Sequence, residues 1–144
     1  MTTTPADVLA AYPARYCAAW GQHDVATALE VVAPDVHWVD PLLPEPFTGH
    51  EGAAGFFQGA WQGFPDLAFE LVGEPLVDAA NNRVTAEWVM TGTHTGEFPP
   101  GAPVSGNAFR VAGSDTWEVD AEGRALSVHA YYDTLTLLKA IGLA

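Results

Sequence analysis

The sequence has few cationic residues and a single cysteine. Its 144 residues include five Lys and Arg against 18 Asp and Glu, which gives a formal net charge of −13 at pH 7. An electrostatic field of that sign repels phosphate backbones and anionic lipid headgroups, so nucleic acids and membrane surfaces are poor partners. Cys17 is the only cysteine, which excludes an internal disulfide and a thiolate metal cluster.

Long apolar runs, targeting signals and nucleotide-binding motifs are also missing. No stretch approaches the ~18 consecutive apolar residues of a membrane span, and MTTTPADVLAAY at the start lacks a basic region followed by an apolar run. There is no phosphate loop, no G-x-S-x-G and no dinucleotide fingerprint. We expect a soluble cytoplasmic protein, and a chain of this length fits one domain over residues 1–144.

Helices are predicted in the first half of the chain. Apolar residues at helical spacing follow Thr4 and Pro5, with Thr4 as the expected cap. A second helix is expected from about Asp24 to Ala33, ended by Pro34. A third helix is expected over residues 51–62, and a short one near the end of the chain.

Strands are predicted mainly in the second half. Alternating apolar residues mark five of them, over residues 36–41, 67–72, 83–91, 107–119 and 124–133. A long loop rich in Gly and Pro is expected over residues 92–106. This order predicts an α+β fold, in which a curved, mostly antiparallel sheet wraps around three N-terminal helices as a cone with one open mouth.

Two aspartates stand in phase with apolar core residues. Asp40 shares a face with Trp38 on its strand, and Asp115 shares a face with Trp117 on its own. An unpaired buried carboxylate costs several kcal/mol or takes up a proton. Both residues are therefore candidates for acid–base chemistry. The structural alternatives are a loop-backbone bond for Asp40, and an Arg or His partner or a bulge for Asp115.

Tyr16 is the third candidate. It lies on the helical stripe that faces the core, so its hydroxyl needs a partner if it is buried. The alternative is an ordinary core tyrosine whose hydroxyl reaches the surface.

Two segments resemble a known family. Residues 15–49, RYCAAWGQHDVATALEVVAPDVHWVDPLLPEPFTG, resemble the N-terminal half of the bacterial ketosteroid isomerases. Residues 114–133, SDTWEVDAEGRALSVHAYYD, resemble the same family's aspartate strand, turn and aromatic-ended strand. These isomerases share the nuclear transport factor 2-like (cystatin-like) cone with the SnoaL-like polyketide cyclases. The resemblance implies that cone for nearly the whole chain, a homodimer, and no metal or organic cofactor.

The resemblance also implies a role for each polar candidate. The isomerase's general base falls on Asp40, its oxyanion-hole tyrosine on Tyr16 and its protonated oxyanion-hole aspartate on Asp115. In that chemistry a base removes a proton next to a ketone, two hydrogen bonds hold the enolate oxygen, and the base returns the proton to another carbon.

The chain departs from both groups of relatives. Tyrosines that support the oxyanion tyrosine in some isomerases fall on Val32 and Phe57, which carry no hydroxyl. The loop over residues 92–106 is similar to SnoaL-like proteins instead. The acid–base pair of the SnoaL-like cyclases falls near Ala130 and on Asp115, so that pair does not carry over either.

A small apolar molecule, steroid-like or polyketide-like, is the expected partner. Residues expected to contact it are Trp20, Trp38, Phe57, Trp61, Trp88, His94, Trp117 and Tyr132. For most of the aromatic residues plain core is the competing interpretation, and for His94 a solvated loop position. The five histidines show no converging ligand set, so no metal site is expected.

Two functions stay open beside the isomerase. One is different chemistry on the same fold, such as aldol cyclisation of a polyketide or epoxide hydrolysis, with His94 at the mouth of the cone. The other is a non-catalytic module that binds a small ligand.

Overall fold

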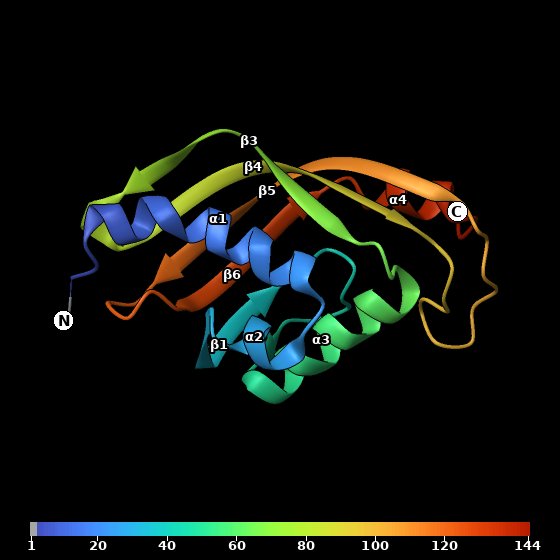
Figure 1. The fold of residues 1–144 in the computed structure, drawn as a ribbon, viewed down its shortest axis with the longest axis horizontal. Helices are drawn as coiled ribbons and strands as arrows, with labels where there is room; N and C mark the ends of the chain where they lie inside the picture. The colour runs from blue at the N-terminus through green and yellow to red at the C-terminus, as the bar shows by residue number, and fades with distance from the viewer. Residues whose placement is uncertain (1–2) are drawn as a thin grey trace.

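The computed structural model describes residues 3–144 and confirms the predicted α+β cone. Helices and strands follow one another along the chain as shown in Figure 1. The helices are α1 (Ala6–Gln22), α2 (Val25–Leu29), α3 (His50–Gly63), α4 (Thr134–Ala140) and the short 3₁₀ helix η1 (Ala79–Asn81). The strands are β1 (Val32–Val39), β2 (Phe47–Thr48), β3 (Ala68–Asp78), β4 (Arg83–Thr93), β5 (Ala108–Val119) and β6 (Ala125–Tyr132).

The strands form one curved sheet in the order β2-β1-β6-β5-β4-β3. Every neighbouring pair is antiparallel except β1 and β6, which run parallel. The long strands β3, β4 and β5 bend over α1, which lies along the concave side of the sheet (Figure 1). Helix α3 packs against β1 and β2. The helices thus close one side of the curved sheet around an interior.

The alternation of the strands places residues as predicted. Val36 and Trp38 are fully buried on β1, and Asp40, directly after that strand, is 7% exposed. On β5, Asp115 is 2% exposed and Trp117 is fully buried. Both aspartates therefore point into the interior with the apolar side chains of their strands.

The N-terminal boundaries differ from the prediction in two places. Thr4 does not cap α1, because its hydroxyl donates to the carbonyl of Val119 at 2.6 Å and so ties the chain to β5. Asp24 caps α2 as expected by accepting from the backbone N–H of Thr27 at 3.2 Å. However, α2 ends at Leu29 and Pro34 lies inside β1, because the chain joins the sheet from Val32 onward.

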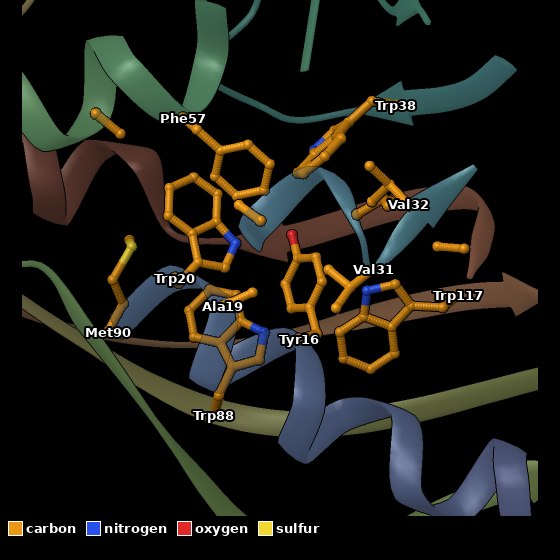
Figure 2. Packing of buried hydrophobic residues seen from close by; sticks show 14 of the residues in the cluster. Tyr16, Ala19, Trp20, Val31, Val32, Trp38, Phe57, Trp88, Met90 and Trp117 are labelled. Carbon is orange, nitrogen blue, oxygen red and sulfur yellow. The ribbon is translucent and has the colours of Figure 1, made fainter. Parts of the chain in front are cut away.

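The interior is dominated by aromatic rings. Tyr16 lies at the centre, with the rings of Trp117 at 5.0 Å, Trp38 at 6.1 Å and Trp20 at 6.4 Å between centroids. Figure 2 shows the Tyr16 hydroxyl surrounded by these rings and by Phe57. A polar group at this position therefore lies in a low-dielectric environment.

Candidate active site

A cavity between the concave face of the sheet and the helices contains all three polar candidates. Tyr16 comes from α1, Asp40 from the end of β1 and Asp115 from β5. The cavity holds about 510 Å³ of empty space, counting the part that opens to solvent. The rest of its lining is aliphatic or aromatic, and no Lys or Arg of the described residues contributes to it. The structure thus brings together the residues that the sequence placed on separate elements.

Asp40 is held by two hydrogen bonds to one oxygen. Its Oδ1 accepts from the backbone N–H of Leu42 at 2.9 Å and from the hydroxyl of Tyr132 at 2.8 Å. Burial raises the pKa of Asp40, and these two donors oppose the rise. The loop-backbone bond considered from the sequence is therefore present, and the carboxyl lines the cavity as well. Within residues 3–144 no hydrogen bond falls on Oδ2, which leaves that oxygen for proton transfer.

Asp115 lies between two small neighbours. In the sheet it is in register with Ala86 of β4 and Ala130 of β6, so no side chain beside it covers the carboxyl. Within the part of the chain that the structure describes, its Oδ1 has no hydrogen-bond partner, and no Arg or His pairs with it. An ion pair therefore does not explain why this carboxyl is buried.

Burial raises the pKa of Asp115 to about 8, and the charge of Asp40 adds to the rise. The hydroxyl of Tyr16 and the indole of Trp88 oppose it. At neutral pH Asp115 is therefore mostly protonated, and a protonated carboxyl donates a hydrogen bond. Asp115 is therefore suited to donate a hydrogen bond, whereas the two donors to Asp40 favour the ionised form that a base requires.

Tyr16 remains a phenol under the same conditions. Burial raises its pKa well above the ordinary value, and the negative charge of Asp115 acts in the same direction. A buried neutral tyrosine is a hydrogen-bond donor. Tyr16 and Asp115 therefore supply two O–H donors to the cavity.

Three of the eight predicted contact residues line the cavity, namely Trp20, Trp88 and Tyr132. Four others are buried in the core behind the cavity wall and do not line it: Trp38, Phe57, Trp61 and Trp117. For these four the competing interpretation, plain core, fits the geometry.

His94 lies neither at the mouth of the cavity nor in solvent. It is fully buried, and its Nδ1 lies 2.9 Å from the hydroxyl oxygen of Ser105. The ring packs against Phe64 at 5.5 Å between centroids. The reason is that β4 continues to Thr93 and the His94 N–H then bonds to the carbonyl of Asn107, so the residue stays inside the fold.

Several aromatic lining residues were missing from the predicted contacts. They are Phe56, Phe64, Phe69, Phe98 and Phe109. Phe69 and Phe109 stand in phase on their strands, so the alternation carried a signal for them. Phe98 lies in the Gly- and Pro-rich loop, which has no periodicity from which its position follows.

Neither a metal-ligating cluster nor a membrane-spanning helix is found in residues 3–144. No three His, Cys, Asp or Glu side chains of these residues gather where a metal ion would be held. None of the helices is long and apolar enough to cross a membrane.

Comparison with known proteins places the chain in a family. The SnoaL-like domain family matches residues 14–128, and no curated protein matches. A proposed SnoaL-like polyketide cyclase from Jannaschia sp. CCS1 has a similar structure, with a TM-score of 0.81 and 21% identity over 100% of this chain and 99% of the other. TsrD from Streptomyces laurentii gives a TM-score of 0.78 and 19% identity over 97% and 98% of the two chains.

A nuclear transport factor 2-like protein of unknown function from Exiguobacterium sp. 255-15 is more distant. Its TM-score is 0.68 and its identity 13%, over 85% of this chain and 98% of the other. At such low identities these structures are evidence for the fold and not for a reaction. The match over residues 14–128 shows that the chain belongs to the SnoaL-like domain family, and the solved structures show that it has the fold of nuclear transport factor 2-like proteins.

Proposed function

We propose that the protein is a cofactor-free enzyme that removes a proton next to a carbonyl group of a small apolar substrate. Asp40 is the base, and Tyr16 and Asp115 are the donors that hold the resulting enolate oxygen. One observation carries the proposal: Asp115, Tyr16 and Asp40 line the same apolar cavity. Asp115 has a raised pKa, Tyr16 is a neutral phenol, and among the described residues no group donates to Oδ2 of Asp40.

The reaction has two proton transfers. Asp40 takes the proton from the carbon next to the carbonyl, and the electron pair of that C–H bond moves to form the enolate, with its charge on oxygen. The O–H groups of Tyr16 and Asp115 donate to that oxygen and stabilise it in the absence of bulk water. Asp40 then returns the proton to a different carbon, which isomerises the substrate and regenerates the carboxylate.

Proton exchange with solvent tests the base without knowledge of the substrate. We expect wild-type protein in D₂O to exchange the enolisable protons of some member of a panel of cyclic and fused-ring ketones, followed by NMR. Asp40→Asn should lower the exchange rate by about 10²- to 10⁴-fold, the usual contribution of a positioned base.

Asp35→Asn is the matched control, because Asp35 is exposed on β1, the strand that Asp40 directly follows. It should exchange at the wild-type rate. An Asp40→Asn protein that folds normally and still exchanges at the wild-type rate would refute the assignment of the base.

Polyketide cyclisation is the second candidate, and the family match favours it. An aldol cyclisation begins with the same deprotonation, but the enolate carbon then attacks a second carbonyl of the substrate. The π bond of that carbonyl breaks, and the resulting alkoxide oxygen takes the proton from Asp40. The same three residues serve both reactions until that point. Formation of a carbon–carbon bond distinguishes cyclisation from isomerisation. The cyclised product has the mass of the substrate and a different chromatographic retention time, and NMR identifies the new bond.

The raised pKa values of Asp40 and Asp115 argue against a purely passive binding module. A cavity that only holds an apolar ligand gains nothing from two buried carboxyls, which cost stability. His94 does not line the cavity, so in either reaction the acid–base roles are assigned to Asp40, Tyr16 and Asp115 and not to His94.

A further inference from the structure

Two tryptophans at the cavity wall carry indole N–H groups without a formed hydrogen bond. Within residues 3–144 the Nε1 atoms of Trp20, Trp38, Trp88 and Trp117 are buried and unpartnered. Only Trp20 and Trp88 among these four also line the cavity. Buried donors are normally paired, and of these four only the two at the wall can act on groups that line the cavity.

Trp88 lies beside Asp115 because of a glycine. On the sheet Trp88 stands opposite Gly113, and Asp115 is the next inward-facing residue along β5. A Cβ atom on Gly113 would lie 2.6 Å from Cη2 of Trp88, so only glycine lets the indole lie over β5 at this point. The Trp88 indole lowers the pKa of Asp115, the effect expected of a donor directed at that carboxyl.

Trp20 lies beside Tyr16 as Trp88 lies beside Asp115. The two residues are one turn apart on α1, with ring centroids 6.4 Å apart and planes at 72°. The Trp20 indole lowers the pKa of Tyr16. Figure 2 shows the nitrogen atoms of Trp20 and Trp88 on the ring edges that face Tyr16.

The two kinds of group differ in what they can do. An indole N–H is a donor only, whereas a phenol and a protonated carboxyl each carry one donor and an oxygen that accepts. If an indole donates to the oxygen of such a group, the O–H of that group is free for the ligand. The donated hydrogen bond also makes the O–H more acidic and a stronger donor.

We propose that Trp20 and Trp88 are positioning residues whose indole N–H groups are already directed at Tyr16 and Asp115 in the ligand-free protein and donate to them when a ligand binds, so that both O–H groups point to one ligand oxygen. This inference rests on the function proposed above and adds a substrate class to it. A site with four neutral donors and no Lys or Arg suits an oxygen that only accepts and whose charge is delocalised, such as that of an enolate or an aromatic phenolate. A localised carboxylate or phosphate lacks a counter-charge here.

The first test is made on the ligand-free protein. The carboxyl of Asp115 is titrated by ¹³C NMR in wild type, Trp88→Phe and Trp38→Phe, with near-UV circular dichroism to check the fold. Trp88→Phe should increase the proton affinity of Asp115 roughly tenfold, since one pKa unit is a factor of ten and a lost donor favours the protonated form. Trp38→Phe removes an equally buried indole N–H behind the cavity wall and should leave the titration of Asp115 unchanged. An unchanged titration in Trp88→Phe would overturn the role of Trp88.

The second test uses naphthols as fluorescent mimics of a delocalised enolate. Wild type should bind them, and Trp20→Phe and Trp88→Phe should each weaken binding roughly tenfold, the effect of one lost hydrogen bond to a charged oxygen. Trp38→Phe should bind as wild type does.

Two further variants separate this inference from the proposed function. If Tyr16→Phe and Asp115→Leu weaken binding while Trp20→Phe and Trp88→Phe do not, the oxyanion hole stands and the role of the indoles is refuted. If Tyr16→Phe and Asp115→Leu bind as wild type does, the hole itself is refuted, and the role of the indoles with it.

Discussion

At the scale of single residues, the property of Asp115 that serves the proposed function lowers the stability of the fold. Its carboxyl is an uncharged donor only because the apolar interior raises its pKa to about 8. The unfolded chain releases the same proton near the ordinary value of 3.8. Folding therefore retains a proton that the unfolded chain loses above pH 4, and the free energy of unfolding decreases as the pH rises.

The sign of this pH dependence gives a prediction for Asp115→Asn. Between about pH 4 and pH 8 the unfolded state binds fewer protons than the folded state, so wild-type stability should fall by about 1.4 kcal/mol per pH unit from this group. Asparagine does not titrate, so the variant should lose this slope and gain up to roughly 4 kcal/mol at pH 7. Urea denaturation at pH 5, 6, 7 and 8 measures both effects.

Asp40 also has a raised pKa and contributes a residual slope of the same sign in both proteins. The exposed Asp35→Asn variant serves as the control and should keep the wild-type slope. Parallel stability curves for wild type and Asp115→Asn would mean that Asp115 is ionised in the folded protein at neutral pH.

At the scale of elements, the loop between β4 and β5 contributes Phe98 to the cavity wall. The backbone N–H of Gly96 bonds to the carbonyl of Gly63 at 3.1 Å, and Phe98 packs against Phe64 at 5.2 Å between ring centroids. Gly63 ends α3 and leaves room for the Phe98 side chain, since a Cβ atom there would lie 2.4 Å from Cβ of Phe98. The loop therefore docks through a notch at the end of α3.

Filling that notch should displace the loop. Gly63→Ala is expected to destabilise the protein by about 1–3 kcal/mol, the usual cost of overpacking, and to weaken naphthol binding because Phe98 lines the cavity. Gly59→Ala is the matched control on the same helix, with open space where its Cβ would lie. It should leave binding unchanged and stabilise α3 by up to about 1 kcal/mol.

Urea denaturation and naphthol titration of the two alanine variants measure the difference. Equal effects on binding would show that the notch at Gly63 does not hold the loop over the cavity.

At the scale of the whole molecule, the two carboxyls predict a bell-shaped pH dependence of proton exchange. Asp40 must be ionised to accept a proton, so the rate should rise with pH through its raised pKa. Asp115 must be protonated to donate, so the rate should fall again near pH 8. In Asp115→Asn the fall near pH 8 should be absent. A fall that persists in that variant would belong to another group.

Much of this architecture follows from local patterns in the sequence. Alternation on the strands placed Asp40 and Asp115 among core residues, and helical spacing placed Tyr16 on the inward side of α1. The order of helices and strands predicted the α+β cone. These features depend on the period of a strand or a helix, which neighbouring residues determine.

Only the tertiary structure decided which side chains line the cavity. Tyr132 reaches the carboxyl of Asp40 because β6 pairs in parallel with β1, a contact between strands far apart in the chain. Trp38 and Trp117 are in phase with the aspartates, but the rings lie behind the cavity wall. Periodicity separates inside from outside and does not distinguish a cavity wall from a closed core.

Periodicity also fails to predict which residues of the loop over residues 94–107 are buried. His94 became a core residue because β4 continues to Thr93 and pairs it with Asn107, and Phe98 became a lining residue because the loop docks on α3 at Gly63. By itself, then, the sequence determined the cone and the inward direction of the three polar residues, since both follow from local period. Their convergence on one cavity, and the indoles that face them, were decided by strand pairing and loop docking, which bring together residues that no local pattern relates.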